Sequence, residues 1–241
     1  MTAGVSRALL DAWERGLERP PHARAAALLA ATDPGDDDAL AHISLGRRDA
    51  RLLDLRARAI GDRVEGVATC AECGEDMELE FDLDDVRASP PESPALALAR
   101  AGYDVEFRLP DGADVAAAAR RGELGAARAE LLRRCVTGAR RDGRDVAATE
   151  LPEEVAVAVA DAMAAADPQA DVELATECPA CGAPARVPFD VAAFVWAEVD
   201  ARARRVLRDV HTLASAYGWR EDDILSLGPA RRALYLEMAG G

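Results

Sequence analysis

The sequence contains no lysine, and its charge is strongly unbalanced. All 29 basic residues are arginine, 44 residues are acidic, and the formal net charge is −15. A chain this acidic repels phosphate backbones as a whole, so a nucleic-acid partner is not expected. We interpret the absence of lysine as the codon bias of a proteome rich in arginine and alanine.

Aromatic residues and long apolar runs are also scarce. Half of the residues are hydrophobic, but many are alanine and only 4% of the chain is aromatic. This composition favours closely packed helices over a β-sandwich. No apolar run reaches 18 residues, and residues 1–7 lack the apolar core of a signal peptide. We therefore expect no membrane span and a cytoplasmic protein.

The motifs of common enzyme classes are missing from the sequence. There is no Gly-rich phosphate loop, no GxSxG, no HExxH, and no convincing Ser/His/Asp set. Each of these patterns places a specific nucleophile, metal or phosphate in a reactive geometry. We therefore predict a protein that is not an enzyme and has no catalytic residues.

One cysteine motif occurs twice, at an offset of 108 residues. Residues 70–74 read CAECG, and residues 178–182 read CPACG. The same offset pairs Val-Glu at 64–65 with 172–173 and Phe-Asp at 81–82 with 189–190. Short alternating runs lie between each Gly and Phe. The repeat therefore predicts a unit of strand, CxxCG turn, strand and helix.

This unit is typical of a zinc knuckle, in which two thiolates point the same way from a tight turn. A structural Zn²⁺ takes four ligands in a tetrahedron, and each knuckle supplies two. The predicted ligands of one shared structural zinc are Cys70, Cys73, Cys178 and Cys181. The alternatives are a redox pair, inert core cysteines, a knuckle that has lost its metal, or two zinc ions with additional ligands. A redox CxxC should open a helix after a buried strand, whereas strand-like residues follow both copies here.

The remaining pattern predicts a mainly helical α+β fold, with the two knuckle hairpins joined by helices. Residues 1–88 form a helical half with the first knuckle, 89–101 a Pro-rich linker, and 102–241 a half with the second knuckle. Residues 103–110 alternate like a strand, and the lone Cys135 is expected to be buried. Asp190 begins the longest helix, which should pack across the knuckles. The apolar stripe of that helix is Val195, Val199, Val206, Val210, Leu213 and Tyr217.

Several phrases of the sequence form a recognisable set. The C-terminal phrases are FDVAAFVWAE at 189–198, HTLASAYGW at 211–219 and ILSLGPARRALYL at 224–236. Upstream phrases are FRLP at 107–110, LPE at 151–153 and DPQAD at 167–171, and N-terminal phrases are LDAWERG at 10–16 and RDARLL at 48–53. Together they resemble the baseplate hub assembly chaperones of contractile phages and their relatives in phage-tail-like injection particles. The two N-terminal phrases resemble the longer members from injection systems.

The resemblance implies a non-enzymatic factor or structural component for the central hub or baseplate of a contractile tail. Its partners would be hub or spike proteins, and it supplies no catalytic residues. Neither the client subunit nor the oligomeric state follows from it, nor whether the protein stays in the finished particle.

A protein client requires a binding surface, which we place within residues 219–236. Trp219, Tyr235, Arg231 and Arg232 combine aromatic rings with arginine, a composition favoured at binding hot spots. Alternatively, the two aromatic residues merely hold the last helix on the long one. The competing function is a zinc-ribbon protein that binds nucleic acid or acts as a regulator. Against it, residues 198–232 hold seven arginines and six acidic residues, which leaves no basic face.

Overall fold

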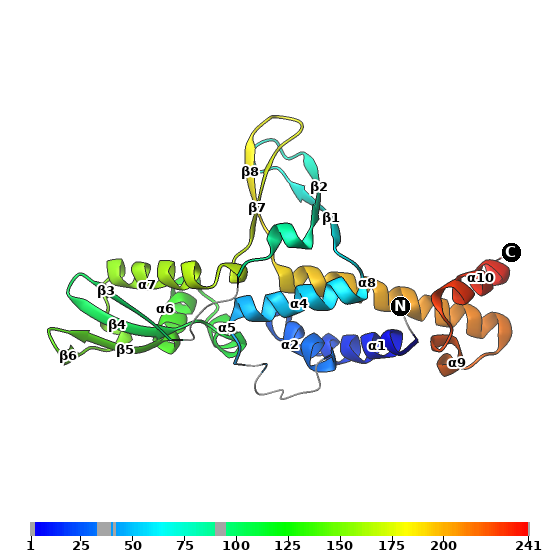
Figure 1. The fold of residues 1–241 in the computed structure, drawn as a ribbon, viewed down its shortest axis with the longest axis horizontal. Coiled ribbons are helices and arrows are strands. Elements are labelled where there is room, and N and C mark those ends of the chain that lie inside the picture. The colour runs from blue at the N-terminus through cyan, green and yellow to red at the C-terminus, as the bar shows by residue number, and fades with distance from the viewer. Residues whose placement is uncertain (1–2, 33–39, 41, 90–94, 241) are drawn as a thin grey trace.

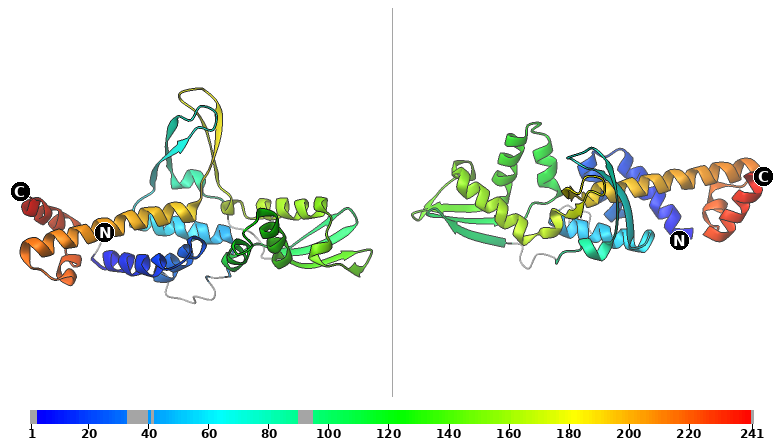
Figure 2. Two further views of the ribbon diagram at one scale, coloured as in Figure 1. Left: turned by 180° about the vertical axis from the view of Figure 1, so that it is seen from behind. Right: turned by 90° about the horizontal axis from the view of Figure 1, so that it is seen from above.

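The protein is an elongated body of helices from which two β-hairpins project together (Figure 1). The computed structural model describes residues 3–32, 40, 42–89 and 95–240. A lobe containing a sheet occupies one end of the body, a layer of helices the middle, and two C-terminal helices the other end (Figure 2). Within the described residues, no helix is both long enough and apolar enough to cross a membrane.

Four helices form the middle layer. They are α1 (Ala3–Leu17), α2 (Pro21–Thr32), α4 (Leu45–Ala59) and α8 (Val191–Tyr217). Local sequence signals set their ends. Pro21 starts α2 at a position where its missing N–H costs nothing, and the Ser44 hydroxyl caps α4 by accepting from the Arg47 amide at 3.3 Å. Gly218 ends α8 in the left-handed region, with φ 69°.

One hydrophobic core joins the two halves that the sequence predicted. Its buried members come from residues 9–86 and from residues 191–225, so α8 packs on α1, α2 and α4. Polar contacts also join α8 to the N-terminal helices. Trp13 Nε1 of α1 donates a hydrogen bond to Asp200 of α8 at 2.7 Å. Arg56 Nε, on a side chain 3% exposed, pairs with Glu198 at 2.9 Å. The N-terminal helices and α8 therefore stabilise one another.

The sheet lobe lies between the two hairpins in sequence and has its own core. Its antiparallel sheet has the order β3 (Ala95–Arg100), β4 (Tyr103–Arg108), β5 (Val136–Arg141) and β6 (Arg144–Asp145). Its helices are α5 (Gly112–Ala119), α6 (Leu124–Cys135) and α7 (Glu153–Ala166). Tyr103, Val105 and Phe107 alternate on the face that packs against Val155 and Val159 of α7. The predicted strand from residue 103 is confirmed.

The linker prediction needs a correction in its second half. Pro90, Pro91 and Pro94 lie outside the described residues. Ala95–Arg100, however, form strand β3 and pair with β4 along its whole length. Leu96 and Leu98 alternate with alanines and pack on the lobe's core. This period-two pattern specifies a strand directly after the prolines. The domain division at 89–101 remains a prediction.

Short elements complete the chain. They are η1 (Leu83–Val86), η2 (Ala148–Glu150), η3 (Pro168–Ala170), α9 (Glu221–Leu225) and α10 (Pro229–Gly240). The mainly helical α+β class, with a small sheet, two hairpins and a long C-terminal helix, is the class that the sequence predicted.

Candidate metal centre

The two projecting hairpins are built alike, residue for residue. Strands β1 (Arg63–Thr69) and β2 (Asp76–Asp82) pair so that Glu65 faces Glu80 and Thr69 faces Asp76. Strands β7 (Glu173–Glu177) and β8 (Pro184–Pro188) pair Glu173 with Pro188 and Glu177 with Pro184. Each of these positions is 108 residues beyond its counterpart. The sequence repeat is therefore a structural repeat in the same register.

The CxxCG turns at the hairpin tips also match. In the first, the Cys70 amide donates to the Glu75 carbonyl at 2.8 Å and the Gly74 amide to the Cys70 carbonyl at 2.9 Å. The second turn repeats both bonds, at 2.9 Å each, from Cys178 and Gly182. Gly74 and Gly182 have φ of 76° and 71°, a region in which a side chain is strained. Both glycines are thus required by the turn, which explains their repetition.

The turns bring all four predicted cysteines together. Their sulfur atoms lie within 4.8 Å of one another. Cys70 Sγ is 3.9 Å from Cys181 Sγ, and Cys73 Sγ is 3.7 Å from Cys178 Sγ. A regular tetrahedron with Zn–S bonds of about 2.3 Å has edges of about 3.8 Å, so the sulfur set fits a tetrahedral zinc. The contacts pair each hairpin's first cysteine with the other's second, as a pseudo-twofold axis requires.

The surroundings of the sulfurs also fit thiolate ligands. The buried pair, Cys70 and Cys178, packs with Met77, while Cys73 and Cys181 are exposed. Backbone amides of Cys181 and Ala180 lower the pKa of Cys178 to about 7, whereas the neighbouring thiols, Cys181 above all, raise the pKa of Cys73 to about 12. Four thiols at this spacing cannot all ionise unless a cation compensates their charge, and zinc binding supplies that compensation.

A redox role finds no support in this geometry. Each CxxC turn joins two strands of a hairpin, whereas a thioredoxin-like motif opens a helix. The chemistry that this arrangement offers is structural, with four soft donors closing one coordination sphere.

The repeat continues to the foot of the hairpins. Phe81 and Phe189, equivalent by the 108-residue offset, meet edge to face with ring centroids 5.3 Å apart. Asp82 and Asp190 each start the following helix, and the Asp190 carboxylate accepts from the Ala193 amide at 2.9 Å. Leu83 and Val191, the next equivalent pair, are both buried in the central core.

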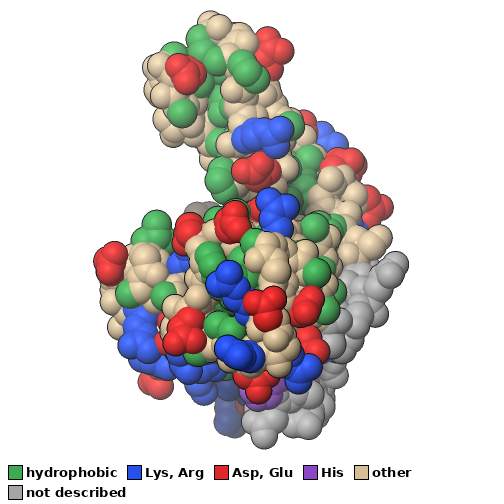
Figure 3. Space-filling view, turned by 90° about the vertical axis from the view of Figure 1, so that its left-hand side faces the viewer, with side chains coloured by type: hydrophobic (Ala, Val, Ile, Leu, Met, Phe, Trp, Pro, Cys, Tyr) green, Lys and Arg blue, Asp and Glu red, His purple; other side chains and the backbone are tan. Residues whose placement is uncertain are grey.

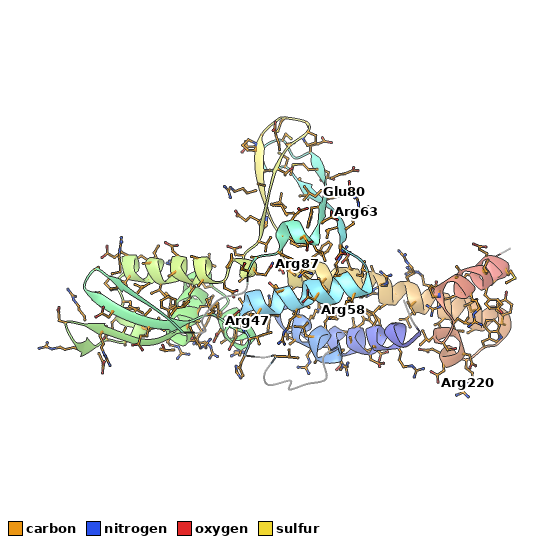
Figure 4. All side chains as sticks on the ribbon, in the orientation of Figure 1. Arg47, Arg58, Arg63, Glu80, Arg87 and Arg220 are labelled. Carbon is orange, nitrogen blue, oxygen red and sulfur yellow. The ribbon has the colours of Figure 1, made fainter. Side chains whose placement is uncertain are left out.

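The foot is fixed to the body on both sides. Phe189 also contacts Phe194 of α8, with centroids 5.1 Å apart. Arg87, labelled in Figure 4, donates to Asp54 of α4 at 2.8 Å. The long helix was expected to pack across the knuckles. It runs instead beneath their feet, because its apolar stripe packs on α1, α2 and α4 (Figure 1).

The fifth cysteine lies apart from the cluster. Cys135, 1% exposed, sits in the sheet lobe at the end of α6, as the sequence predicted. Burial and the nearby Asp114 raise its pKa to about 12. It is therefore an inert thiol within a polar network of Asp114, Arg108 and Arg134 that the sequence did not reveal.

The predicted partner residues gather at the α8–α10 end. Trp219 stacks on Tyr217 with centroids 4.7 Å apart and meets Tyr235 edge to face at 4.8 Å. These rings hold α10 against the end of α8 while remaining partly exposed. Arg231 is exposed. Arg232 is 8% exposed and turns inward towards α9.

Tyr217 was assigned to the core stripe of α8 and needs a correction. It is 38% exposed and belongs to the aromatic cluster of Tyr217, Trp219 and Tyr235. The helix extends beyond the N-terminal helices at this point, so the apolar period no longer faces a core (Figure 1). The nearby Trp219 was the sequence signal that could have indicated an aromatic cluster at this end of α8.

The surface offers little to a nucleic-acid backbone on the face seen in Figure 3. Acidic side chains lie among the basic ones over the sheet lobe and below the hairpins. An electrostatic footprint for nucleic acid would require basic residues gathered along one stripe or face.

Most of the chain matches one known protein family. A family model described as T4 bacteriophage base plate protein matches residues 25–196. No curated protein and no solved structure matches the chain significantly. The matched residues include both hairpins, the sheet lobe and the start of α8. Two of the three C-terminal phrases that resemble hub chaperones, at 211–219 and 224–236, lie beyond them. The chain belongs to the T4 bacteriophage base plate protein family.

Proposed function

We propose that the protein is a non-enzymatic assembly factor or structural component of the central hub or baseplate of a contractile tail or injection particle. The family match over residues 25–196 carries this proposal. The sequence resemblance to hub assembly chaperones supports the assembly role and the hub as the place where it acts. Its partners are then hub or spike proteins rather than nucleic acid or membrane.

Within this function, the hairpin pair holds one structural zinc through Cys70, Cys73, Cys178 and Cys181. The support is the fit of the sulfur set to a tetrahedron. When bound, zinc would fasten the two tips without further chemistry, because all four positions are filled by protein thiolates. The hairpins would then form a stiff projection from the body, available for contact with neighbouring subunits (Figure 1).

The partner surface is proposed at the α8–α10 end. It comprises Trp219, Tyr235 and Arg231, extended by Tyr217, and lies beside the exposed Leu234 and Met238. Arg232 belongs to the same end of the molecule, but its side chain is buried behind this surface. Partly exposed aromatic rings next to an exposed arginine have the composition of binding hot spots.

Co-purification with hub and spike proteins from the same gene cluster tests this function. Arg231→Glu should weaken capture of the bound subunit at least tenfold, about 1.4 kcal/mol. The physical reason is that the added charge repels acidic groups on the partner and lies beside the aromatic cluster. The matched control is Arg144→Glu, the same charge change on an exposed residue of β6 at the other end of the body.

Two results would contradict the proposal. Normal capture by Arg231→Glu would exclude the surface, and failure of every hub and spike protein to bind the wild type would exclude the function. Arg232→Glu is unsuitable for this test because the buried guanidinium donates to the Ile224 and Leu225 carbonyls, and a carboxylate in its place would disrupt the packing of this end.

A further inference from the structure

A cavity of about 230 Å³ lies between α8 and α10, beside Leu227 in the turn that precedes α10. Its charged lining is Arg202, Arg205 and Arg232 with Asp209, and its apolar lining includes Leu227 and Leu236. Arg205 and Arg232 thus line the same cavity as the Asp209 carboxylate. The cavity is smaller than the roughly 300–1,000 Å³ of sites for drug-sized molecules, which suits the end of a peptide or a single side chain.

Arg232 is the unusual member of this lining. Only 8% of it is exposed, and its buried Nε has no hydrogen-bond partner among the residues that the structure describes. Its Nη2 donates only long bonds, 3.5 Å to the Ile224 carbonyl and 3.4 Å to the Leu225 carbonyl. Within the described part of the chain, no carboxylate lies within 4.0 Å of an Arg232 nitrogen. A buried guanidinium normally has such a partner, because an unpaired buried charge is costly. The charge of Asp209 is the nearest compensation: burial raises the pKa of Asp209, and Arg232 opposes that rise.

We infer that this cavity binds a carboxylate of a partner protein, carried next to an aliphatic side chain. Guanidinium groups bind carboxylates through short, charge-assisted hydrogen bonds. The apolar walls would accept the aliphatic group, while Arg232 and Arg205 would hold the charge. This inference rests on the proposed function, in which the α8–α10 end binds a partner, and it names the partner's chemistry.

The position of the cavity supports a role in partner choice. Its lining residues, 202–236, lie wholly outside residues 25–196 that match the family. The residues that the family model matches therefore do not contain the cavity. Arg231 and Tyr235 of the proposed partner surface lie on α10 beside Arg232, so one partner segment could occupy both.

A small-molecule titration tests the cavity without the partner. The full-length protein is labelled with ¹⁵N, and its arginine Nε–Hε resonances are followed as N-acetyl-L-leucine is added. N-acetyl-L-leucinamide, which has the same side chain but no charge, is the matched control ligand. We expect a saturable shift of the Arg232 Nε–Hε resonance with the carboxylate and none with the amide.

Two arginine variants locate the binding. Arg205→Gln should weaken N-acetyl-L-leucine about tenfold, because it removes one guanidinium from the cavity. Arg208→Gln is the matched control, an arginine of α8 outside the lining, and should bind normally.

Three results would overturn the inference: no saturable shift of Arg232, an equal response to the amide, or an equal response to inorganic phosphate. Equal weakening of ligand binding by Arg205→Gln and Arg208→Gln would also overturn it, since the binding would then depend on the overall positive charge of α8 and not on the cavity. The titration is independent of the partner-capture experiment. The inference about the cavity can therefore be wrong while the effect of Arg231→Glu still supports the proposed function.

Discussion

Cys178→Ser is expected to abolish stoichiometric zinc binding and to lower the stability of the protein more than the loss of a buried ion pair would. Structural zinc sites contribute on the order of 10 kcal/mol to folding, because the ligands are assembled only in the folded state. Replacing the buried Cys178 would leave three sulfur ligands and a serine hydroxyl, which is a poor zinc ligand. Zinc content and the midpoint of thermal unfolding measure both effects.

Cys70→Ser should have the same effect as Cys178→Ser, since the two cysteines are equivalent in the repeat. The double variant should be scarcely worse than either single one, because each alone already opens the shared site. Additive losses would indicate two separate sites. Cys135→Ser is the matched control, a buried cysteine of the sheet lobe that should leave the zinc content unchanged.

Asp114→Asn is expected to destabilise the sheet lobe by about 3 kcal/mol, the lower end of the cost of breaking a buried ion pair. The Asp114 carboxylate is fully buried and accepts from Arg108 Nη1 at 2.6 Å and Arg134 Nε at 2.7 Å. The Asp111 amide donates to it at 3.0 Å. An amide group keeps the shape but faces two guanidinium groups with one acceptor fewer. Urea unfolding at neutral pH measures the loss.

The same residue predicts a pH dependence. Burial acts to raise the pKa of Asp114, but hydrogen bonds from Arg108, the Asp111 amide and Arg134 outweigh it, so the pKa lies below its usual range. Its contribution is therefore fully present above the unfolded-state pKa of about 3.9 and is lost as the pH falls towards the lower folded-state pKa. The stability difference between wild type and Asp114→Asn should shrink below about pH 4.

Metal release at acid pH affects both proteins equally and cancels in that difference. The control is Asp104→Asn, an exposed aspartate of β4, which should cost little at any pH. A difference between wild type and Asp114→Asn that stays constant down to about pH 2 would show that the charge of Asp114 does not stabilise the fold.

The hairpin pair could be predicted from sequence because its signals are local and doubled. The CxxCG turns, the alternating strands and the Phe-Asp at each foot occur twice at one offset, and the structure keeps the same register in both copies. Two copies of one motif indicate a common partner, so the meeting of the four cysteines could be expected. That the four cysteines hold one zinc is our proposal.

Features that depend on long-range packing could not be predicted in the same way. The inward turn of Arg232 depends on where the end of α9 lies, because Arg232 donates to the Ile224 and Leu225 carbonyls. Arg231 beside it has the same residue type and is exposed. Asp114 carries an ordinary helix-start pattern with Asp111, while its arginine partners come from β4 and α6. Strand β3 follows a cluster of prolines that suggested a linker.

The central claim is that the two hairpins share one structural zinc, and the metal content of the wild-type protein tests it most directly. Protein purified without chelator should contain about one zinc per chain, coordinated by four sulfurs in X-ray absorption. A protein that contains no metal, or two zinc ions per chain with mixed ligands, would contradict the shared site.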